Sequence, residues 1–495
     1  MRGLCPGPLD DGSVLVRAGA GEWARYYTAR LSALKRKTNL NLASSGAQPT
    51  VVPRSGHPIS RSAISANALR VLYRLKEGGY QAFLVGGSVR DLLLGLQPKD
   101  FDIATNASPD EVRALFRNCR LIGRRFRLAH VYFGNEIVEV ATFRAAHQWQ
   151  PEERDEDEWH AADPAAQRVL DARGRILRDN VYGTIEEDVW RRDFTANALY
   201  YNIEDFSVWD FVGGVEDVAA RRLRLIGDPV TRYHEDPVRM LRAIRFAAKL
   251  GFSIETHTEE PIRELAYLLT HVPAARLFDE TLKLFLSGFG CEALRLLQHY
   301  GLLEHLFPQA GALLKRAPHG AEAQLLQAGL ANTDARVAAD KPVTPTFLFA
   351  VLFYGPVAER ARQLQENGQP ESLALFNACE EIVRTQQSRV SIPRRFTLPM
   401  REMFTLQPRF RRREGKKALS LLSHPRFRAA YDLLLLRAQV GAEEAEIAKW
   451  WTEVQTASAA ERETMVKSGN GPGHSPGTRR PRRRRRRRRP SSASP

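Results

Sequence analysis

The stretch that most limits how this chain can fold is 83–104, which reads FLVGGSVRDLLLGLQPKDFDIA. A strand-like apolar run ends at the paired glycines Gly86 and Gly87, and a short apolar helix pattern follows. Two aspartates, Asp100 and Asp102, then stand one residue apart in a second strand-like run. The order strand, glycine turn, helix, strand predicts a small α/β domain.

The two aspartates are candidate metal ligands. Because side chains alternate along a strand, we expect Asp100 and Asp102 on one face and Phe101 in the core. Two carboxylates on one face repel each other unless a cation neutralises them, and Mg²⁺ prefers such oxygen ligands. Glu139 lies between two valines in a later strand-like run, where an acid fits only if it faces a site. Together the three acids predict a magnesium site for phosphoryl transfer.

Simpler explanations exist for both parts of this motif. Asp-x-Asp spacing also arises by chance, and a second copy, Asp155 and Asp157, lies in the acidic segment 148–167 without a preceding Gly-Gly turn. Paired glycines also form ordinary tight connections between a strand and a helix. At a helix start, with Arg90 in the first turn, they are candidate phosphate ligands. The sequence contains neither GxxxxGK[ST] nor GxGxxG, so it predicts no P-loop and no Rossmann site.

Local signals extend the α/β pattern on both sides. Apolar spacing predicts a helix over 59–80. Ser108 followed by Pro109 is typical of a helix start. Gly134 and Asn135 separate two strand-like runs and predict a two-residue hairpin loop.

From about residue 233 to Trp451 the pattern contains amphipathic helices only, so the predicted fold class is α+β, an α/β head followed by an all-helical body. The acidic segment 148–167 is expected to be a solvated loop of the head. The expected segments are a disordered extension or misassigned start at 1–55, the head at 56–230, a helical neck at 231–300, a helical body at 301–455 and a disordered arginine-rich tail at 456–495.

The charge distribution predicts a polyanionic partner. The chain of 495 residues carries a net charge of +16, and ten arginines lie within 479–489. Such a tail favours RNA or DNA over membrane, although it also fits a solubilising or protein-docking role. No apolar run is long enough to span a membrane. Four scattered cysteines and an acidic N-terminus (Asp10, Asp11) predict a cytoplasmic protein with reduced thiols.

Five motifs between about 59 and 290 carry a family resemblance: LVGGSVRDLLLG, KDFDIAT, VEVATFR, RRDFTANALYY and EDPVRMLRAIRFA. In this order they resemble the class II nucleotidyltransferase superfamily, which contains tRNA CCA-adding enzymes and bacterial poly(A) polymerases. Ser88 is a minor departure, since Gly or Ala is common there. The segment LIGRRFRLAHV at 121–131, the helical region 411–440 and the arginine-rich tail resemble the poly(A) polymerase branch.

The resemblance implies transfer of AMP from ATP to RNA 3′ ends with Mg²⁺, or Mn²⁺ in its place. It implies that Asp100 and Asp102 bind the metal, that Glu139 is a third acid and that Asp193 supports the sugar or the catalytic centre. Glu235, Asp236 and Arg239 match the nucleobase-reading motif, where Asp236 is also expected to cap a helix that has Pro237 at its first position. The nucleotide-binding residues that it implies are Gly86, Gly87, Arg90, Arg191, Arg192, Asp193, Glu235, Asp236 and Arg239.

Several arginines and one lysine are candidates for contact with RNA. Arg242, Arg245 and Lys249 share one side of a helix whose opposite side is apolar, although this pattern taken alone favours a solvated basic face over RNA contact. Likewise, Arg191 to Asp193 would fit an ordinary helix start with surface charges. The RNA-binding candidates are Arg124, Arg125, Arg242, Arg245, Lys249, Arg411, Arg412 and Arg413.

Two other functions remain open at this point. A CCA-adding or A-adding tRNA enzyme belongs to the same superfamily, but it would have to select CTP and then ATP and stop after a fixed number of additions. An RNA-binding scaffold with an inactive head is also conceivable, although the intact acids and arginines argue against it. The resemblance makes ATP and RNA 3′ ends the expected partners, with RNA-decay proteins as candidate partners of a monomer.

Overall fold

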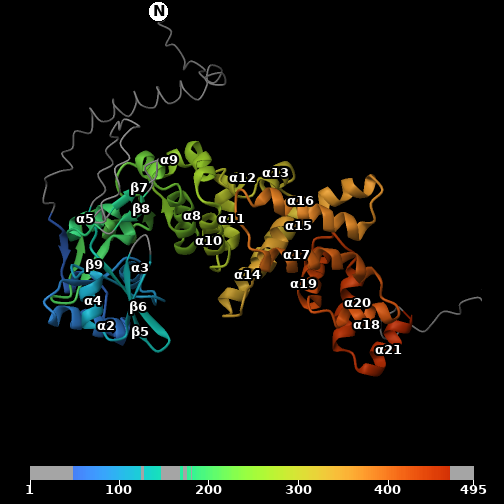
Figure 1. The fold of residues 1–495 in the computed structure, drawn as a ribbon, viewed down its shortest axis with the longest axis horizontal. Helices are drawn as coiled ribbons and strands as arrows, with labels where there is room; N and C mark the ends of the chain where they lie inside the picture. The colour runs from blue at the N-terminus through green and yellow to red at the C-terminus, as the bar shows by residue number, and fades with distance from the viewer. Residues whose placement is uncertain (1–47, 124–126, 146–167, 171–175, 180, 469–495) are drawn as a thin grey trace, which may run out of the picture. The chain divides into compact units, whose positions relative to one another are not determined.

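The computed structural model describes residues 48–123, 127–145, 168–170, 176–179 and 181–468. From Thr50 onward the chain forms one unit by its internal contacts. The larger of its sheets lies in the blue-to-green part of the ribbon, and the yellow-to-red part contains helices only (Figure 1). The α+β class predicted from the sequence is therefore confirmed.

An eight-stranded sheet forms the centre of the head, in the order β1-β10-β9-β2-β3-β6-β5-β4. Neighbouring strands are antiparallel except β3 and β6, which run parallel. The strands are β1 (Thr50–Val52), β2 (Ala82–Val85), β3 (Asp102–Thr105), β4 (Cys119–Ile122), β5 (Leu128–Phe133), β6 (Glu136–Thr142), β9 (Leu199–Asn202) and β10 (Val208–Asp210).

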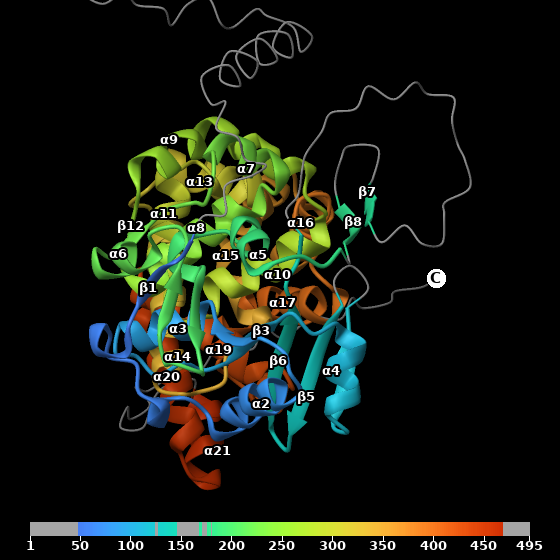
Figure 2. The same cartoon turned by 90° about the vertical axis from the view of Figure 1, so that its left-hand side faces the viewer.

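Helices cover both faces of this sheet, which explains why the central strand β2 is apolar and buried throughout. In β2, Leu84 belongs to the main hydrophobic cluster, whereas Phe83 and Val85 belong to a second cluster that includes Val189. Figure 2 shows α2 and α4 beside β5 and β6. The head helices are α2 (Ala66–Glu77), α3 (Gly87–Leu93), α4 (Pro109–Leu115), α5 (Ile185–Arg191) and α6 (Gly214–Ala219).

The helix cap predicted at Ser108 and the turn predicted at Gly134 and Asn135 are confirmed. Ser108 accepts a hydrogen bond from the backbone N–H of Glu111 and starts α4, with Pro109 as its first residue. Gly134, at a φ of 62°, and Asn135 form the two-residue loop between β5 and β6. The helix expected over 59–80 is shorter, because Ser65 caps its start and α2 covers Ala66–Glu77 only.

The strands β1, β4 and β12 were not predicted, and neither were the strands between residues 168 and 223. β1 lies within the segment expected to be disordered and pairs with β10 through its backbone. β4 pairs with β5 and lies between Asn118 and Gly123, which are both residue types that favour turns. β12 (Ser253–Ile254) pairs with β11 (Arg222–Leu223) beyond the point where strands were expected to end. Strands this short depend on their partners for hydrogen bonds, so their own sequences indicate little.

The expected tail is also partly folded. Helix α21 (Ala459–Ser468) lies within the segment 456–495 that was predicted to be disordered. Its sequence is polar, but Met465 and Val466 are buried, and the carbonyl of Val466 accepts a hydrogen bond from Gly415. Two apolar anchors therefore hold a helix that composition alone does not predict. The acidic segment 148–167 and the arginines at 479–489 lie outside the described residues.

The rest of the described chain is helical. Phe278 of α10 stacks on Phe349 of α15, with ring centroids 5.9 Å apart. Within the described residues, none of the helices combines the length and apolar character needed to cross a membrane. The principal helices are α7 (Pro229–Glu235), α8 (Val238–Leu250), α9 (Thr256–Leu265), α10 (Ala274–Phe285), α11 (Gly290–His299), α14 (Ala321–Ala338), α15 (Pro345–Glu366), α16 (Glu371–Gln386), α17 (Arg394–Leu406), α19 (Phe427–Gln439) and α20 (Ala445–Thr456).

Candidate active site

A polar pocket with a volume of about 560 Å³ is lined by the head sheet's loops and by α8. It brings together most of the residues singled out from the sequence. Lys99, Asn197 and Phe246 also line it and were not predicted. The predicted residues in its lining are Gly86, Gly87, Arg90, Asp100, Asp102, Arg191, Arg192, Asp193, Asp236, Arg239, Arg242, Arg245 and Lys249.

The acid pair lies where the chain enters β3. Asp102 is the first residue of the strand, and Phe101 is buried, as predicted. Asp100 lies before the strand begins, so the expectation that both aspartates stand on it is wrong, although both line the pocket. Neither carboxylate has an ion pair or a hydrogen bond within the described residues.

Glu139 is directly opposite Asp102 in the parallel pairing of β3 with β6. Loss of hydration raises the pKa of Asp102 to about 6, and the charges of Glu139 and Asp100 act in the same direction. Glu139 itself accepts a hydrogen bond from His130, whose Nε2 is 3.2 Å from its Oε2. The acid cluster is therefore one in which an added cation would relieve repulsion between like charges.

The donor set at this position fits a cation that completes its shell with other ligands. Within the described residues, no group of three or more His, Cys, Asp or Glu side chains is arranged to hold a metal ion. Glu139 is engaged with His130, which leaves the carboxylates of Asp100 and Asp102 for a metal. Mg²⁺ commonly binds through one or two carboxylates and keeps water molecules and substrate phosphates as its remaining ligands.

The Arg192–Asp193 segment carries two separate ion pairs. Arg192 donates from Nε and Nη2 to Oδ2 of Asp188, at 3.2 and 3.0 Å, and from Nε to the hydroxyl of Tyr200 at 2.8 Å. Asp193 accepts a hydrogen bond from Nε of Arg242 at 2.7 Å. Burial opposes ionisation of Asp193, but the Arg242 guanidinium outweighs it and lowers the pKa of Asp193. Asp193 therefore orients Arg242, which was expected to face RNA.

Asp236 lies between α7 and α8, and the helix cap that was expected at this residue lies one residue later. Helix α8 begins at Val238, so Pro237 occupies the cap position that was predicted for Asp236. The Asp236 carboxylate still accepts a hydrogen bond from the backbone N–H of Val238, at 3.2 Å. Its other oxygen accepts a hydrogen bond from Arg276 of α10 at 2.6 Å, a partner that the sequence did not indicate.

Glu235 does not line the pocket, unlike its neighbours in the predicted nucleobase-reading motif. Its Oε2 accepts hydrogen bonds from Nη1 of Arg232 at 2.7 Å and from Nη1 of Arg239 at 2.8 Å. Glu235 therefore fixes the position of Arg239, which does line the pocket, and is not placed to contact a nucleotide directly.

The glycine turn and Arg90 are engaged with the protein. Gly86 has a φ of 72°, and its N–H donates to the carbonyl of Leu199, which ties the turn to β9. Arg90 is only 2% exposed and donates to Asp91 at 2.7 Å and to Asn197. Both line the pocket, but these bonds hold the strand-to-helix connection in place.

An aromatic ring organises the basic side of the pocket. The ring centroid of Phe246 lies 5.5 Å from the guanidinium carbon of Arg90, 5.4 Å from that of Arg242 and 4.3 Å from that of Arg245. Stacking of this kind fixes the direction of a guanidinium at little cost in hydration. Phe246 is thus a pocket residue that was not predicted from the sequence.

The remaining RNA-binding candidates lie elsewhere. Arg411 forms ion pairs with Glu371 at 2.8 Å and with Glu443 at 3.2 Å, so it joins two helical segments of the body. Arg412 and Arg413 follow it and do not line the pocket. Arg124 and Arg125 lie outside the described residues.

Three family models match the chain. They are described as "Poly A polymerase head domain" over residues 82–224, "Probable RNA and SrmB- binding site of polymerase A" over 251–314 and "Polymerase A arginine-rich C-terminus" over 367–490. A protein named Poly(A) polymerase I from Escherichia coli O6:H1 is 49% identical over 439 residues, which cover 88% of this chain and 92% of the relative. This chain belongs to the poly(A) polymerase I family.

The other branch of the superfamily is more distant from this poly(A) polymerase I family member. A CCA-adding enzyme of Geobacillus thermodenitrificans is 37% identical over 252 residues, which cover 50% of this chain and 57% of that enzyme. A solved structure titled "tRNA-processing enzyme (apo form I)" superposes with a TM-score of 0.54 at 23% identity, over 82% of this chain and 99% of that one. The similarity to the solved structure shows a shared fold only.

Proposed function

We propose that this family member transfers AMP from ATP to the 3′ ends of RNA without a template. The observation that carries the proposal is the 49% identity to a Poly(A) polymerase I over most of both chains. The pocket supports it, because its lining combines a set of arginines with Asp100 and Asp102, two acids that form no ion pair within the described part of the chain. The terminal 3′-hydroxyl oxygen attacks the α-phosphorus of ATP, and pyrophosphate leaves.

Asp100 and Asp102 would hold the Mg²⁺, or Mn²⁺ in its place, that this chemistry uses. When bound, a divalent cation stabilises negative charge on the reacting phosphate oxygens. Glu139 adds negative charge beside Asp102 and is itself held by His130. We therefore assign Glu139 to shaping the acid cluster, together with His130.

Arg191 and Arg192 are proposed to contact the triphosphate. The ion pair with Asp188 and the Tyr200 hydroxyl hold Arg192 in place before any nucleotide arrives. Asp193 fixes Arg242, which lines the same pocket, in a similar way. Positive groups held in place in advance do not have to reorganise as charge moves from the α-phosphate to the leaving pyrophosphate.

Asp236 and Arg239 are proposed to read the nucleobase. Both line the pocket, and each is held by a charged partner behind it, Arg276 for Asp236 and Glu235 for Arg239. A base with the wrong hydrogen-bonding edge would leave these groups unpaired, which penalises it.

The RNA backbone is proposed to meet Lys99, Arg245 and Lys249 at the same pocket. Lys99 and Lys249 are exposed side chains, so they can approach a phosphate without rearrangement of the protein. Arg124, Arg125 and Arg411 to Arg413 remain candidates for contact with more distant parts of the RNA. The tail at 479–489 would add contacts that ignore base sequence.

We propose that the segments expected from the sequence have different functions. Residues 56–230 would carry the chemistry, 231–300 the nucleobase and the RNA end, and 301–455 further RNA. The pairing of β1 with β10 adds Thr50–Val52 to the head. We propose, from the family resemblance of the sequence, a cytoplasmic monomer that associates with RNA-decay proteins.

An incorporation assay with each nucleoside triphosphate alone tests the proposal. On a generic RNA, we expect ATP to be added repeatedly to give long tails, with little addition from CTP, GTP or UTP. Addition of two cytidines and one adenosine to tRNA only would favour the CCA-adding alternative. No addition with any nucleotide, although RNA is bound, would favour the inactive scaffold.

A further inference from the structure

Arg232 does not line the pocket, but it forms hydrogen bonds with residues at two different parts of the pocket wall. It belongs to α7 and is 8% exposed. Its Nη2 donates to the backbone carbonyl of Arg192 at 2.6 Å and to that of Arg191 at 3.2 Å. Its Nη1 donates to Oε2 of Glu235 at 2.7 Å. One guanidinium therefore joins the loop at the proposed triphosphate end to the motif at the nucleobase end.

The connection continues from Glu235 to Arg239. The same carboxylate oxygen accepts from Nη1 of Arg239 at 2.8 Å, and that nitrogen also donates to the backbone carbonyl of Arg232 at 2.7 Å. An uninterrupted series of hydrogen bonds thus runs from the carbonyl of Arg192 to the side chain of Arg239. Only the two ends of this series line the pocket.

The positive charge of Arg232 strengthens the hydrogen bonds of this series. Burial, and then the neighbouring charge of Arg239, lower the pKa of Arg232 to about 10, while Glu235 acts in the opposite direction. Arg232 is therefore still charged at neutral pH, and its hydrogen bonds are of the stronger, charge-assisted kind. Its planar fork reaches two carbonyl groups and one carboxylate at once, which the single ammonium of a lysine cannot do.

We propose that Arg232 is a positioning residue that couples the phosphate end of the pocket to its nucleobase end. The proposal rests on the proposed function, since it concerns how that site chooses ATP. An adenine that fits Asp236 and Arg239 leaves Glu235 and Arg232 in place, so the Arg191–Arg192 loop is held for the triphosphate. A wrong base that displaces Arg239 loosens the loop through Arg232. Base choice then affects turnover as well as binding.

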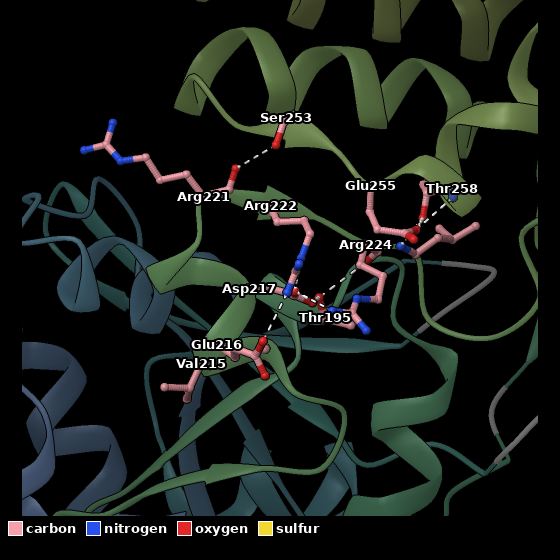
Figure 3. A network of polar contacts seen from close by, with 12 residues as sticks. Thr195, Val215, Glu216, Asp217, Arg221, Arg222, Arg224, Ser253, Glu255 and Thr258 are labelled. Carbon is pink, nitrogen blue, oxygen red and sulfur yellow. Dashed lines mark hydrogen bonds and ion pairs between the residues drawn. The ribbon is translucent and has the colours of Figure 1, made fainter.

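A second buried network supports the same loop without reaching Arg239, and it supplies a matched control. Figure 3 shows Arg222 and Thr195 directed at Asp217, which is fully buried. Asp217 accepts from Nε of Arg222 at 2.7 Å, from Nη2 of Arg224 at 2.8 Å and from the Thr195 hydroxyl at 2.7 Å. Arg222 and Asp217 do not line the pocket. Arg222→Lys therefore weakens a comparable ion pair outside the proposed connection.

The test compares single-nucleotide addition from ATP and from CTP by the full-length parent, Arg232→Lys, Arg222→Lys, Arg239→Ala and the Arg232→Lys/Arg239→Ala double variant. We expect Arg232→Lys to lower the ratio of kcat/KM for ATP over CTP about tenfold, which corresponds to about 1.4 kcal/mol. Part of this loss should lie in kcat for ATP. Arg222→Lys should change the ratio less than about twofold, and the double variant should discriminate no worse than Arg239→Ala alone.

Equal losses with ATP and CTP in Arg232→Lys would overturn the proposal and leave Arg232 a purely structural role. Independent, multiplying losses in the double variant would overturn it too. If Arg232→Lys melts below the assay temperature, Glu235→Gln keeps the side-chain size and weakens the same connection, and an unchanged ATP preference in it would count against the coupling. Failure of the proposed function itself is seen earlier, as absence of AMP addition by the parent.

Discussion

The carboxylates around the pocket divide into two groups. Asp100 and Asp102 line it without an ion pair among the described residues. Asp193, Glu235 and Asp236 are each bound to at least one arginine. The first group is therefore suited to receive a cation from solution, whereas the second holds arginines in place for an anionic substrate. Acids of one chemical type thus serve opposite electrostatic purposes within a single pocket.

The largest effect is expected from the unpaired group. Asp102→Asn should lower AMP addition by about a thousandfold or more, because charge on the reacting phosphate would lose its stabilisation. The melting temperature should not fall, since the substitution removes a carboxylate that lies beside Glu139 and has no ion pair or hydrogen bond with the residues that the structure describes. Activity assays and thermal melts of the purified variant check both parts. Asp432→Asn, in an acid of α19 that pairs with Arg428, serves as the control and should retain activity.

An Asp102→Asn variant that keeps more than a tenth of the parent's activity would break the distinction between the two groups. A large loss of stability would do so as well, because it would give Asp102 a structural role like that of the paired acids.

The next largest effect is expected from the paired group. Asp193→Asn leaves the Arg242 guanidinium without its carboxylate, so activity and stability should fall together. We expect activity to drop about a hundredfold and the free energy of unfolding by about 2 kcal/mol, at the low end for a buried pair because the Arg242 side chain is 32% exposed. Chemical denaturation and single-AMP addition measure the two. If Asp193→Asn lost activity but kept the parent's stability, Asp193 would belong with Asp100 and Asp102 instead of with the paired acids.

A smaller effect is expected where an arginine itself is removed. Arg239→Ala should reduce the preference for ATP over CTP about tenfold, because the base loses one hydrogen-bonding partner. RNA affinity should change less than twofold, since Arg239 is held by Glu235 at the nucleobase side. Competition between the two nucleotides, with RNA binding measured in parallel, checks this. A variant that loses RNA binding and keeps its ATP preference would reverse the assignment of Arg239.

The smallest effect on chemistry is expected from the tail, whose arginines within 479–489 have no acidic residues between them. Deleting 474–495 should leave single-AMP addition to saturating short RNA nearly unchanged. It should weaken RNA binding and flatten its dependence on salt, by about 0.7 in log–log slope for each phosphate that the tail would otherwise neutralise. The poly(A) tails that the enzyme adds in one binding event should become shorter. An unchanged salt slope and unchanged tail length would instead favour a protein-docking role.

The sequence was most informative where structure depends on neighbours along the chain. The Ser108 cap and the Gly134–Asn135 loop are local, and both formed as predicted. The hairpin loop also sets the register that puts His130 opposite Glu139, so His130 could have been found from the sequence by counting along the two strands. It was overlooked because a lone histidine in a strand carries no signal of its own.

Contacts between distant segments could not be predicted in the same way. Arg232 reaches the carbonyl groups of residues about 40 positions earlier, and Arg276 reaches Asp236 across a similar separation. Nothing in the local pattern distinguishes these arginines from surface charges. Arg242 shows the reverse case, since its helix face predicted RNA contact and its nearest acid, Asp193, lies 49 positions away in sequence.

Binding of Mn²⁺ to the protein without nucleotide or RNA, followed by electron paramagnetic resonance, tests the division between the two groups of acids most directly. The account predicts that Asp102→Asn abolishes Mn²⁺ binding and that Asp193→Asn retains it, because only the first removes a carboxylate that is free to bind a cation. Retention of binding by Asp102→Asn, or its loss in Asp193→Asn at full folding, would contradict the account.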